Sequence, residues 1–466
     1  MTAHDLLDRS LVEKVLAAAL SRGGDFAEVF VEDRATTSLS LDQRRVEELS
    51  SGRDRGAGIR VIVGDTTGFA HTADLSERGL LAAAEAAASV ARAGGGGTTI
   101  VALEDFRSYA TSVTEAPGSV DKRRKVELLQ LADDVARSAG GAISQVSVSL
   151  GDTTRRILVA NTHGTYAGDA QVRVRLNVQT VALADGGMQT GFYPVWGTAG
   201  YEALSLDKVT AAANRAASMA LTKLDARPAP SGSLPVVIAA GYGGMLFHEA
   251  CGHGLEADGV MKQASVYAGR VGEQVASPLV TLVDDGTMAG EWGFLNIDDE
   301  GKPGTYNVLI ENGVLKDYMW DGVEARRAGR ASSGNGRRQT YQHLPMPRMT
   351  NTYLLNGTSK AEDIVSSTDY GIYVTQLGGG QVNPATGDFV FGMNEAFLIE
   401  NVEVTTPLRE ANLIGNGPDV LSRVDAVADD FAIIPGSCGK WGQTVPVGSG
   451  QPTMRVTGMT VGGTAA

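Results

Sequence analysis

The chain has few cysteines and no long apolar run. Only Cys251 and Cys438 occur among its 466 residues, so a disulfide framework does not hold the fold together and a reducing cytoplasm is the expected compartment. No segment approaches the ~18 consecutive apolar residues that a membrane helix needs. The first ten residues also lack the basic and then apolar pattern of a secretory signal. We therefore expect a cytoplasmic protein with no membrane partner.

Positive charge and aromatic side chains are also scarce. Lysine and arginine number 40 against 54 acidic residues, which gives a net charge of −14, and no basic cluster offsets it. This excludes nucleic acid as an expected partner, because nucleic-acid affinity depends on neutralising phosphates. Aromatic residues make up 6% of the chain, but hydrophobic residues reach 43%. That is enough apolar surface for folded cores and excludes general disorder.

The first half alternates strand patterns with alanine-rich helix patterns. Helices are predicted over 11–20, 77–92, 120–139 and 207–224, with Ser10 and Ser119 as N-caps of the first and third and the glycines at 94–97 ending the second. Strands are predicted over 26–32, 37–41, 59–63, 68–71, 145–150 and 172–179, the last from its strict alternation of polar and apolar residues. The order twice runs from strands to a helix, which allows a duplicated unit.

A Pro/Gly/Ser segment at 227–233 is the best domain boundary. It predicts an N-terminal α/β domain over 1–226 and a C-terminal domain over 233–466. The second domain is rich in strand patterns, including a hairpin at Asn312-Gly313, which is a strong type I′ turn signal. The fold class is therefore α+β, with a mostly antiparallel second domain that carries one functional helix from Met245 onward.

The densest chemistry lies in that helix, in the sequence from His248 to His253, His-Glu-Ala-Cys-Gly-His. Zinc hydrolases commonly place two histidines four residues apart on one helix face, with glutamate as general base. Here the spacing is five, and positions i and i+5 differ by about 140° on a regular helix. The helix must therefore widen into a π-turn or break at Gly252 for both histidines to bind one metal.

A catalytic zinc usually takes three protein ligands and keeps one position for water. The residues alone leave four candidates for the third ligand: Cys251, Glu256, Asp258 and Cys438. Cys438 has glycines on both sides and is favoured only slightly over Glu256. Cys251 is more simply explained as a small buried apolar residue.

Four separated motifs resemble the TldD branch of the TldD/PmbA peptidase family. They are His248-Glu-Ala-Cys-Gly-His-Gly-Leu-Glu, Ile297-Asp-Asp-Glu-Gly, Pro347-Arg-Met-Thr-Asn and Ser437-Cys-Gly-Lys with Gln443. The resemblance runs through the whole chain and is richest after Arg227. It implies a zinc-dependent peptidase with one Zn²⁺ per chain and a second domain that is barrel-like. His248, His253 and Cys438 match the family's metal ligands, and Glu249 matches its catalytic glutamate.

The resemblance also implies partners and a substrate class. Its members act on short or unfolded peptides inside a dimer cavity, so we expect a homodimer or a heterodimer with a PmbA/TldE-like relative. Glu249 would accept a proton from the attacking water and pass it to the leaving amine. Independently of the resemblance, an exposed strand near the glycine-rich segment 378–383 could accept an extended peptide, because backbone hydrogen bonds need little sequence preference.

Several residues near the motifs have open roles. His343 and Arg348 are candidates to stabilise the oxyanion of the transition state. Asp298, Asp299 and Glu300 fit a second cation site or, more simply, a solvated turn. The glycine-rich segment 378–383 lacks the Lys-Ser/Thr of a nucleotide loop and is predicted to be a turn between strands.

Two other functions compete with the peptidase. The first is a non-catalytic binding or regulatory subunit whose zinc is structural; such a site is normally closed by four protein ligands, and Cys251 would be the fourth. The second is a zinc amidase that acts on small molecules, which nothing in the ligand set excludes.

Overall fold

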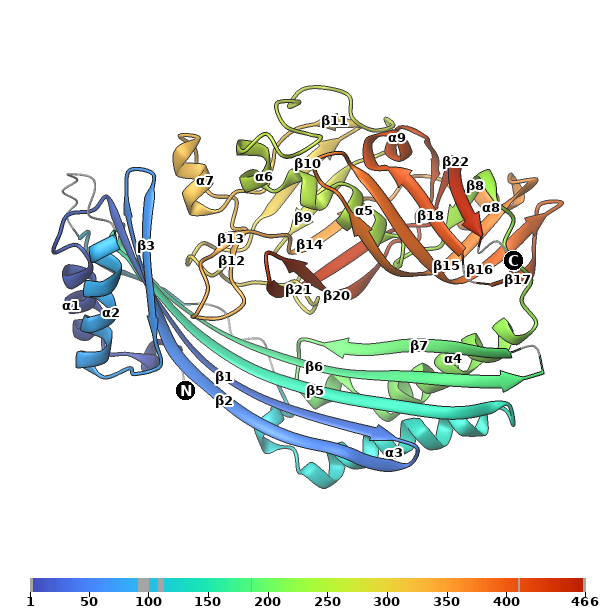
Figure 1. Cartoon of the computed structure of the whole chain (residues 1–466), viewed down its shortest axis with the longest axis horizontal. Coiled ribbons are helices and arrows are strands. Elements are labelled where there is room, and N and C mark those ends of the chain that lie inside the picture. Colours follow the sequence, from blue (N-terminus) through green and yellow to red (C-terminus); the bar gives the residue numbers. More distant parts are fainter. Residues whose placement is uncertain (1–2, 91–99, 108–112, 186, 410, 464–466) are drawn as a thin grey trace.

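The computed structural model describes residues 3–90, 100–107, 113–185, 187–409 and 411–463. The chain folds into two layers of secondary structure (Figure 1). Long curved strands from the first half form one sheet with helices on its outer face. The second half lies over the opposite face of that sheet and contains the shorter strands. The mixed α+β class predicted from the sequence is confirmed.

The first sheet is antiparallel apart from one short strand. Its order is β3-β2-β1-β5-β6-β4, with β7 also paired to β6, and β4 runs parallel to β6. The strands are β1 Phe26–Asp42, β2 Arg45–Val63, β3 Thr66–Thr72, β4 Glu104–Arg107, β5 Ile143–Asn161, β6 Thr165–Ala184 and β7 Gly187–Gly197.

Two short strands predicted at 26–32 and 37–41 are in fact one strand. The polar stretch between them stays extended because β1 is paired along this stretch with β2 on one side and β5 on the other. Backbone hydrogen bonds to both neighbours thus compensate for the weak strand propensity of the polar residues.

The α-helices of the first half lie close to the predicted ranges. They are α1 Arg9–Ala19, α2 Glu77–Val90, α3 Lys122–Ser138 and α4 Leu206–Leu224. The 3-10 turns η1 Ala3–Leu6, η2 Pro117–Ser119 and η3 Tyr201–Ala203 were not predicted. Two predicted N-caps are wrong by two residues. Asp8 and Asp121 cap α1 and α3, because their carboxylates accept the free backbone N–H groups of Ser10 and Arg123. The predicted stop at 94–97 lies outside the described residues.

Small residues bring these helices close to the sheet. A stripe of buried alanines on α4, from Ala212 to Ala220, packs against β5, β6 and β7. A Cβ added at Gly191 of β7 would lie 1.9 Å from the carbonyl oxygen of Ala216. Glycine is therefore required at this position, and the Ala- and Gly-rich composition reflects close helix–sheet packing.

The second half contains a closed barrel beside an open sheet. In the barrel β8, β22, β18, β16 and β15 pair in a ring that closes between β15 and β16, with β17 and β19 attached. The open sheet has the order β11-β10-β9-β14-β21-β20, and β12 pairs with β13. Most pairs are antiparallel, as predicted; β15 with β8 and β14 with β21 are parallel.

The bounds of the elements in this half are as follows. The strands are β8 Gly232–Ile238, β9 Leu282–Asp285, β10 Tyr306–Glu311, β11 Val314–Leu315, β12 Gly336–Arg337, β13 Met346–Pro347, β14 Asn351–Leu354, β15 Tyr370–Val382, β16 Asp388–Glu400, β17 Glu403–Leu408, β18 Ala411–Asn416, β19 Val424–Val427, β20 Ala432–Lys440, β21 Gln443–Gln451 and β22 Met454–Gly463. The helices are α5 Gly244–Ala250, η4 Gly252–Leu255, α6 Ala257–Met261, α7 Gly322–Arg327, α8 Ala361–Ser366 and α9 Gly417–Ser422.

One turn prediction in this half is confirmed and another is wrong. Asn312 and Gly313 both have positive φ, at 48° and 81°, as a type I′ turn requires, and they connect β10 to β11. The segment 378–383, predicted as a turn, instead belongs to β15 as far as Val382, with shifts of register against β16. Its glycines therefore accompany irregular strand pairing rather than a loop.

A small apolar cluster joins the two halves. Phe30 of β1 and Val159 of β5 pack with Ile297 and Tyr341 from the second half. The first sheet takes all its strands from residues before 198, and the other sheets take theirs from residue 232 onward. The division into domains 1–226 and 233–466 stays a prediction.

Candidate metal centre

The helix that carries His248 ends before His253, as the five-residue spacing of the two histidines requires for a shared metal. His248 lies in α5, which ends at Ala250, and Cys251 leaves the helical region at φ −124° and ψ −51°. The chain then resumes as the 3-10 turn η4, which carries His253. Of the two predicted distortions, the break is the one observed. A Cβ at Gly252 would lie 2.1 Å from the sulfur of Met349, so a larger residue at the break would require the buried Met349 side chain to move.

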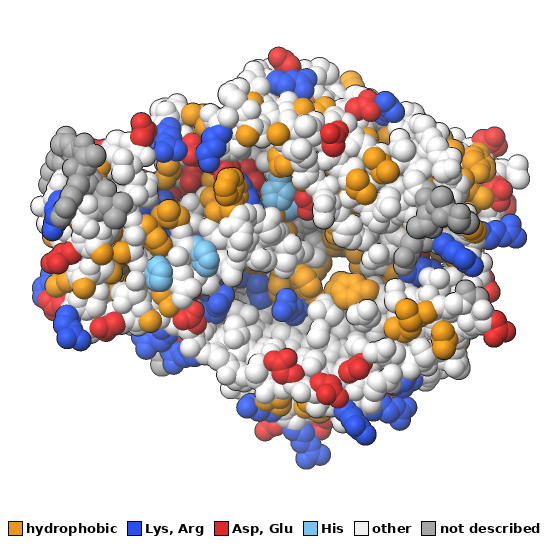
Figure 2. Space-filling view, viewed as in Figure 1, with side chains coloured by type: hydrophobic (Ala, Val, Ile, Leu, Met, Phe, Trp, Pro, Cys, Tyr) orange, Lys and Arg blue, Asp and Glu red, His pale blue; other side chains and the backbone are white. Residues whose placement is uncertain are grey.

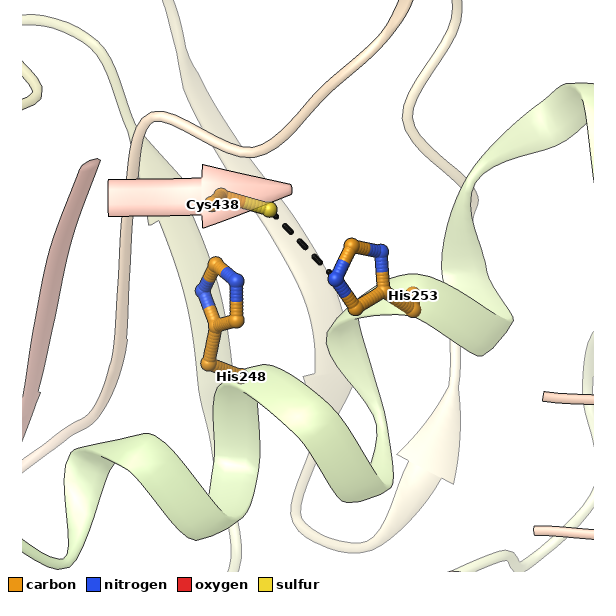
Figure 3. Close-up of side chains that lie close together, drawn as sticks. All are labelled: His248, His253 and Cys438. Atoms are coloured by element: carbon orange, nitrogen blue, oxygen red, sulfur yellow. Dashed lines mark hydrogen bonds between the residues drawn. The ribbon is translucent and has the colours of Figure 1, made fainter. Parts of the chain in front are cut away.

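His248, His253 and Cys438 come together at this break (Figure 3). One ligand atom from each, two ring nitrogens and a sulfur, lie within 4.8 Å of one another. The Cys438 sulfur of β20 is 3.4 Å from Nε2 of His253, and the imidazole rings are nearly perpendicular with centroids 5.2 Å apart. Across the described ranges, no other group of three His, Cys, Asp or Glu residues is this close.

The cluster is buried and favours a thiolate. His248 is 4% exposed and Cys438 is 2% exposed. Burial alone would raise the pKa of the Cys438 thiol, but the charges and hydrogen bonds of His248 and His253 outweigh burial and hold that pKa well below its usual value. A thiolate beside two imidazoles is a set of donors typical of a site for a soft or borderline cation.

Glu256 supports His253 and is absent from the cluster. Its Oε2 lies 3.0 Å from Nδ1 of His253. Burial would raise the pKa of Glu256, but Lys440 and His253 lower it to about 2, so the carboxylate is ionised and accepts the Nδ1 hydrogen. That bond directs Nε2 of His253 towards Cys438. A carboxylate behind a histidine in this way is a common feature of metal sites.

Lys440 and Arg348 complete this support. The Lys440 ammonium lies 2.9 Å from Glu256 and 2.6 Å from Asp258. Arg348 is fully buried and donates a 2.6 Å hydrogen bond to the backbone carbonyl of Cys438. Both cations therefore tie the strand that carries the thiol to its surroundings. The candidates Glu256 and Asp258 thus lie in ion pairs beside the cluster.

Glu249 faces an open pocket next to the cluster. The pocket has a volume of about 480 Å³ and is lined by Glu249 and His253, by Lys440 and Trp441, and by the segment 381–385. The carboxylate of Glu249 lies 3.8 Å from Nε2 of His253. Glu249 is thus the carboxylate of the motif that has access to both solvent and the cluster.

Cys251 lies away from the cluster in a separate environment. It is fully buried, and burial raises the pKa of its thiol to about 12, partly offset by a hydrogen bond with Tyr267. It does not belong to the group of possible metal ligands found in the described part of the chain. The observation favours the interpretation of Cys251 as a buried packing residue.

The acidic motif Asp298-Asp299-Glu300 joins the two halves of the chain. Asp298 accepts hydrogen bonds from three backbone N–H groups. Asp299 lies 2.9 Å from Arg155 of β5, and Glu300 lies 2.7 Å from Arg60 of β2. All three are at most 5% exposed, so the expected solvated turn is wrong. Their oxygens are committed to partners within the chain.

The two oxyanion candidates are not equivalent. The Nη atoms of Arg348 donate to the carbonyls of Cys438 and Gln443, so this residue is a buried support. His343 is half-buried and its Nδ1 lies 2.8 Å from the hydroxyl of Thr340; it is not among the residues that line the Glu249 pocket. Sequence reasoning missed Lys440, although it stands in a quoted motif two residues after Cys438.

Models of one protein family match most of the chain. The PmbA/TldA metallopeptidase domain 1 matches residues 27–91, the central domain matches 115–224 and the C-terminal domain matches 231–463. A metalloprotease TldD homolog from Haemophilus influenzae is 41% identical over 95% of this chain and 94% of its own length. A metalloprotease from Methanothermobacter thermautotrophicus is 33% identical over 94% and 96%.

A relative that matches about half of the chain and two solved structures are also similar to it. A zinc metalloprotease TldD homolog from Saccharolobus solfataricus is 33% identical over 50% of this chain and 52% of its own length. The crystal structure of TldE from Thermococcus kodakarensis matches with a TM-score of 0.79 at 22% identity, covering 97% of this chain and 100% of that one. A putative modulator of a DNA gyrase from Thermotoga maritima matches with a TM-score of 0.82 at 22% identity over 97% and 99%.

No helix among the described residues is long and apolar enough to cross a membrane.

Proposed function

Because the chain belongs to the PmbA/TldD metallopeptidase family, we propose that it is a zinc-dependent peptidase. His248, His253 and Cys438 would hold one Zn²⁺, and Glu249 would be the general base. The observation that carries the proposal is the convergence of these two imidazoles and one thiol within 4.8 Å beside a pocket that exposes Glu249.

The residues present fit a zinc ion. A ring nitrogen of each histidine faces the Cys438 sulfur (Figure 3), and the three donor atoms lie within 4.8 Å of one another. Two nitrogens and a thiolate suit zinc, and three protein donors are typical of catalytic rather than structural sites. When bound there, Zn²⁺ supplies a Lewis acid that acidifies water and polarises a carbonyl.

The chain's own groups would move the protons. Glu249 accepts a proton from the attacking water at its carboxylate and donates it to the leaving amine. Glu256 keeps the Nδ1 hydrogen of His253 in place, so Nε2 stays available as a donor atom. Lys440 balances the charge of Glu256 at a distance of 2.9 Å.

An extended peptide is the substrate that the local architecture favours. Strand β20, which carries Cys438, pairs only with β21 among the described strands and lies at the edge of its sheet. An edge strand offers unpaired backbone groups to an incoming strand, and folded proteins rarely present a free segment of this kind. Short or unfolded peptides are therefore the proposed substrates.

Assembly and compartment are also part of the proposal. We expect a homodimer or a heterodimer with a PmbA/TldE-like relative, in the cytoplasm. The similarity to the fold of TldE from Thermococcus kodakarensis is compatible with such a partner. Light scattering of the chain alone and mixed with the relative tests this assembly.

Hydrolysis of an unfolded protein before and after metal removal tests the function. Activity should disappear after chelation, return on addition of about one Zn²⁺ per chain, and be much lower on the folded form of the same substrate. Activity that persists in full after verified zinc removal, or that acts only on small amides, would contradict the proposal.

A further inference from the structure

A second cavity lies between the N-terminal sheet and the hairpin formed by β20 and β21. Its volume is about 280 Å³. Figure 2 shows lysine and arginine side chains gathered at the hollow between the two halves. Six arginines line this cavity, which we call the arginine cavity: Arg34, Arg155, Arg173, Arg175, Arg337 and Arg338. The two carboxylates of its lining are Asp152 and Asp299.

The sheet contributes one of its faces to the arginine cavity. Most lining residues of β1, β5 and β6 lie at alternate positions, which is the period of side chains on one face of a strand, and Thr37 and Asp152 are the exceptions. Arg34 stands directly opposite Arg155, and Thr153 stands directly opposite Arg173. Like charges opposite each other destabilise a sheet. The arrangement is therefore not explained by strand pairing.

Acidic residues of the chain neutralise only part of this charge. Arg155 lies 2.6 Å from Glu32 and 2.9 Å from Asp299. Arg338 lies 2.5 Å from Glu28. The other lining carboxylate, Asp152, pairs with Lys125 at 2.7 Å. No acidic group of the lining is thus left for the remaining arginines.

Four arginines have no carboxylate within ion-pair distance in the described part of the chain: Arg34, Arg173, Arg175 and Arg337. Arg173 is 9% exposed and donates to the side-chain oxygen of Gln171 and the carbonyl of Trp292. Arg337 is 2% exposed and donates to the carbonyls of Pro446 and Met349. Neutral acceptors satisfy these hydrogens, and the nearby charge of Asp299 offsets only part of the charge of the two guanidinium groups.

Burial of unbalanced charge is costly, and here it occurs in an acidic protein. Burial and then the charges of Arg337 and Arg155 lower the pKa of Arg173 to about 9. The net charge of the whole chain is −14. Nε and Nη1 of Arg338 and Nη2 of Arg155 are also buried without a partner among the described residues. An anion in the cavity would offset these costs.

The arginine cavity is related to the metal cluster through β20. Cys438 is buried in the cluster, and the preceding residue, Ser437, lines the cavity. Adjacent residues of a strand point to opposite faces. A peptide added to the free edge of β20 would alternate its side chains in the same way, so that every second one would lie on the face of the arginine cavity.

We propose that the arginine cavity binds the carboxylate side chains of an acidic peptide segment. This inference rests on the proposed function, because it assigns a substrate preference to the same edge strand. Guanidinium groups bind carboxylates with paired, charge-assisted hydrogen bonds, and the cavity is large enough for more than one side chain. Inorganic phosphate shares this chemistry and is the alternative ligand that the test separates.

The test measures binding without turnover. The full-length, zinc-loaded chain carrying Glu249→Gln is titrated with a fluorescent unfolded peptide that has glutamate at alternate positions, and with the same peptide carrying glutamine there. Anisotropy should give at least ~10-fold tighter binding of the glutamate peptide, decreasing with added salt. The same pair is measured with inorganic phosphate as competitor.

Variants assign the preference to the cavity. Arg173→Gln and the double change Arg34→Gln with Arg175→Gln, made in the same background, should bring the glutamate preference close to 1. Arg123→Gln removes one charge at a side chain that is 87% exposed on α3 and should retain the preference. The double variant changes residues that are half-buried or exposed and keeps the test valid if Arg173→Gln does not fold.

Each outcome decides the inference. Equal binding of the two peptides, or a preference that survives both cavity variants, overturns it. Saturable binding of phosphate that depends on Arg173, with no preference between the peptides, identifies a small-anion site and also overturns it. Zinc content and hydrolysis of the glutamine peptide by the unchanged chain are measured separately. Absence of zinc or of hydrolysis contradicts the proposed function. The ratio of the affinities for the two peptides still decides whether the arginine cavity binds carboxylate side chains.

Discussion

The two faces of the β20–β21 hairpin carry opposite chemistry. On the face of Cys438, which we call the metal face, each charged group has a partner: His253 hydrogen-bonds to Glu256, and Glu256 forms an ion pair with Lys440. The face of Ser437, which we call the arginine face, borders the arginine cavity. There the buried side chains of Arg173 and Arg337 donate hydrogen bonds only to uncharged acceptors. The difference indicates what each face would bind. Two imidazoles and a thiolate that converge suit a cation, and guanidinium groups without a carboxylate partner suit an anion.

The change Glu249→Gln should produce the largest effect on the metal face. A general base contributes about 10²- to 10⁴-fold to a rate, so peptide hydrolysis should fall by about that factor while zinc content stays unchanged. Initial rates and elemental analysis of the same preparation measure both quantities. Glu85→Gln, an exposed site on α2, is the matched control. A fully active Glu249→Gln protein would remove this residue from the mechanism.

The change Glu28→Gln should sharpen the contrast within the arginine face. Glu28 is fully buried and neutralises Arg60 and Arg338. Its loss leaves the buried guanidinium group of Arg338 without a carboxylate partner and should lower the free energy of unfolding by about 3–5 kcal/mol. Arg173→Gln removes a charge that has no acidic partner and should cost much less. The urea midpoints of the two variants test this. Equal losses would mean that Arg173 is a structural residue like Glu28.

The change Glu256→Gln should weaken zinc binding without abolishing it. The amide cannot supply a full negative charge to the Nδ1 hydrogen of His253, and changes of such supporting residues typically cost 10- to 100-fold in metal affinity. Competition with a chromophoric chelator gives the affinity. Asp258→Asn is the control, because Asp258 contacts Lys440 and is not within the cluster. Equal losses in the two variants would argue against a specific role for Glu256.

The change Cys251→Ala should have the smallest effect. Because Cys251 lies outside the cluster and its thiol contacts Tyr267, zinc content and affinity should match those of the unchanged chain. Zinc loss in this variant would indicate a closed site with four protein ligands, and with it a structural metal.

The metal face could be predicted further than the arginine face. The five-residue spacing of His248 and His253 predicted a distortion of the helix between them, either a π-turn or a break at Gly252, and the structure shows the break. Cys438 lies 185 residues from His253, and spacing carries no information over that distance, so its choice among four candidates came from the family resemblance. Glu256 was predicted as a possible ligand because sequence does not distinguish a ligand from the residue that orients it.

The arginine cavity could not be predicted from the sequence, because a polar face of a strand is normally expected to lie in solvent. The alternation around Arg173 and Arg175 correctly predicted a strand with one polar face, and such a face normally lies in water. The second half of the chain covers the part around Arg173, which is buried, and leaves Arg175 exposed. Tertiary contacts of this kind also explain the continuous strand β1, whose polar middle is extended because β2 and β5 lie on either side.

Zinc per chain in the purified protein, measured beside Cys438→Ser, tests the central claim most directly. We expect about one zinc in the unchanged chain and much less in the variant, because a hydroxyl is a far weaker zinc donor than the thiolate held by His248 and His253. Full retention of zinc by the Cys438→Ser protein, or no zinc in a carefully handled unchanged chain, would contradict the site of His248, His253 and Cys438.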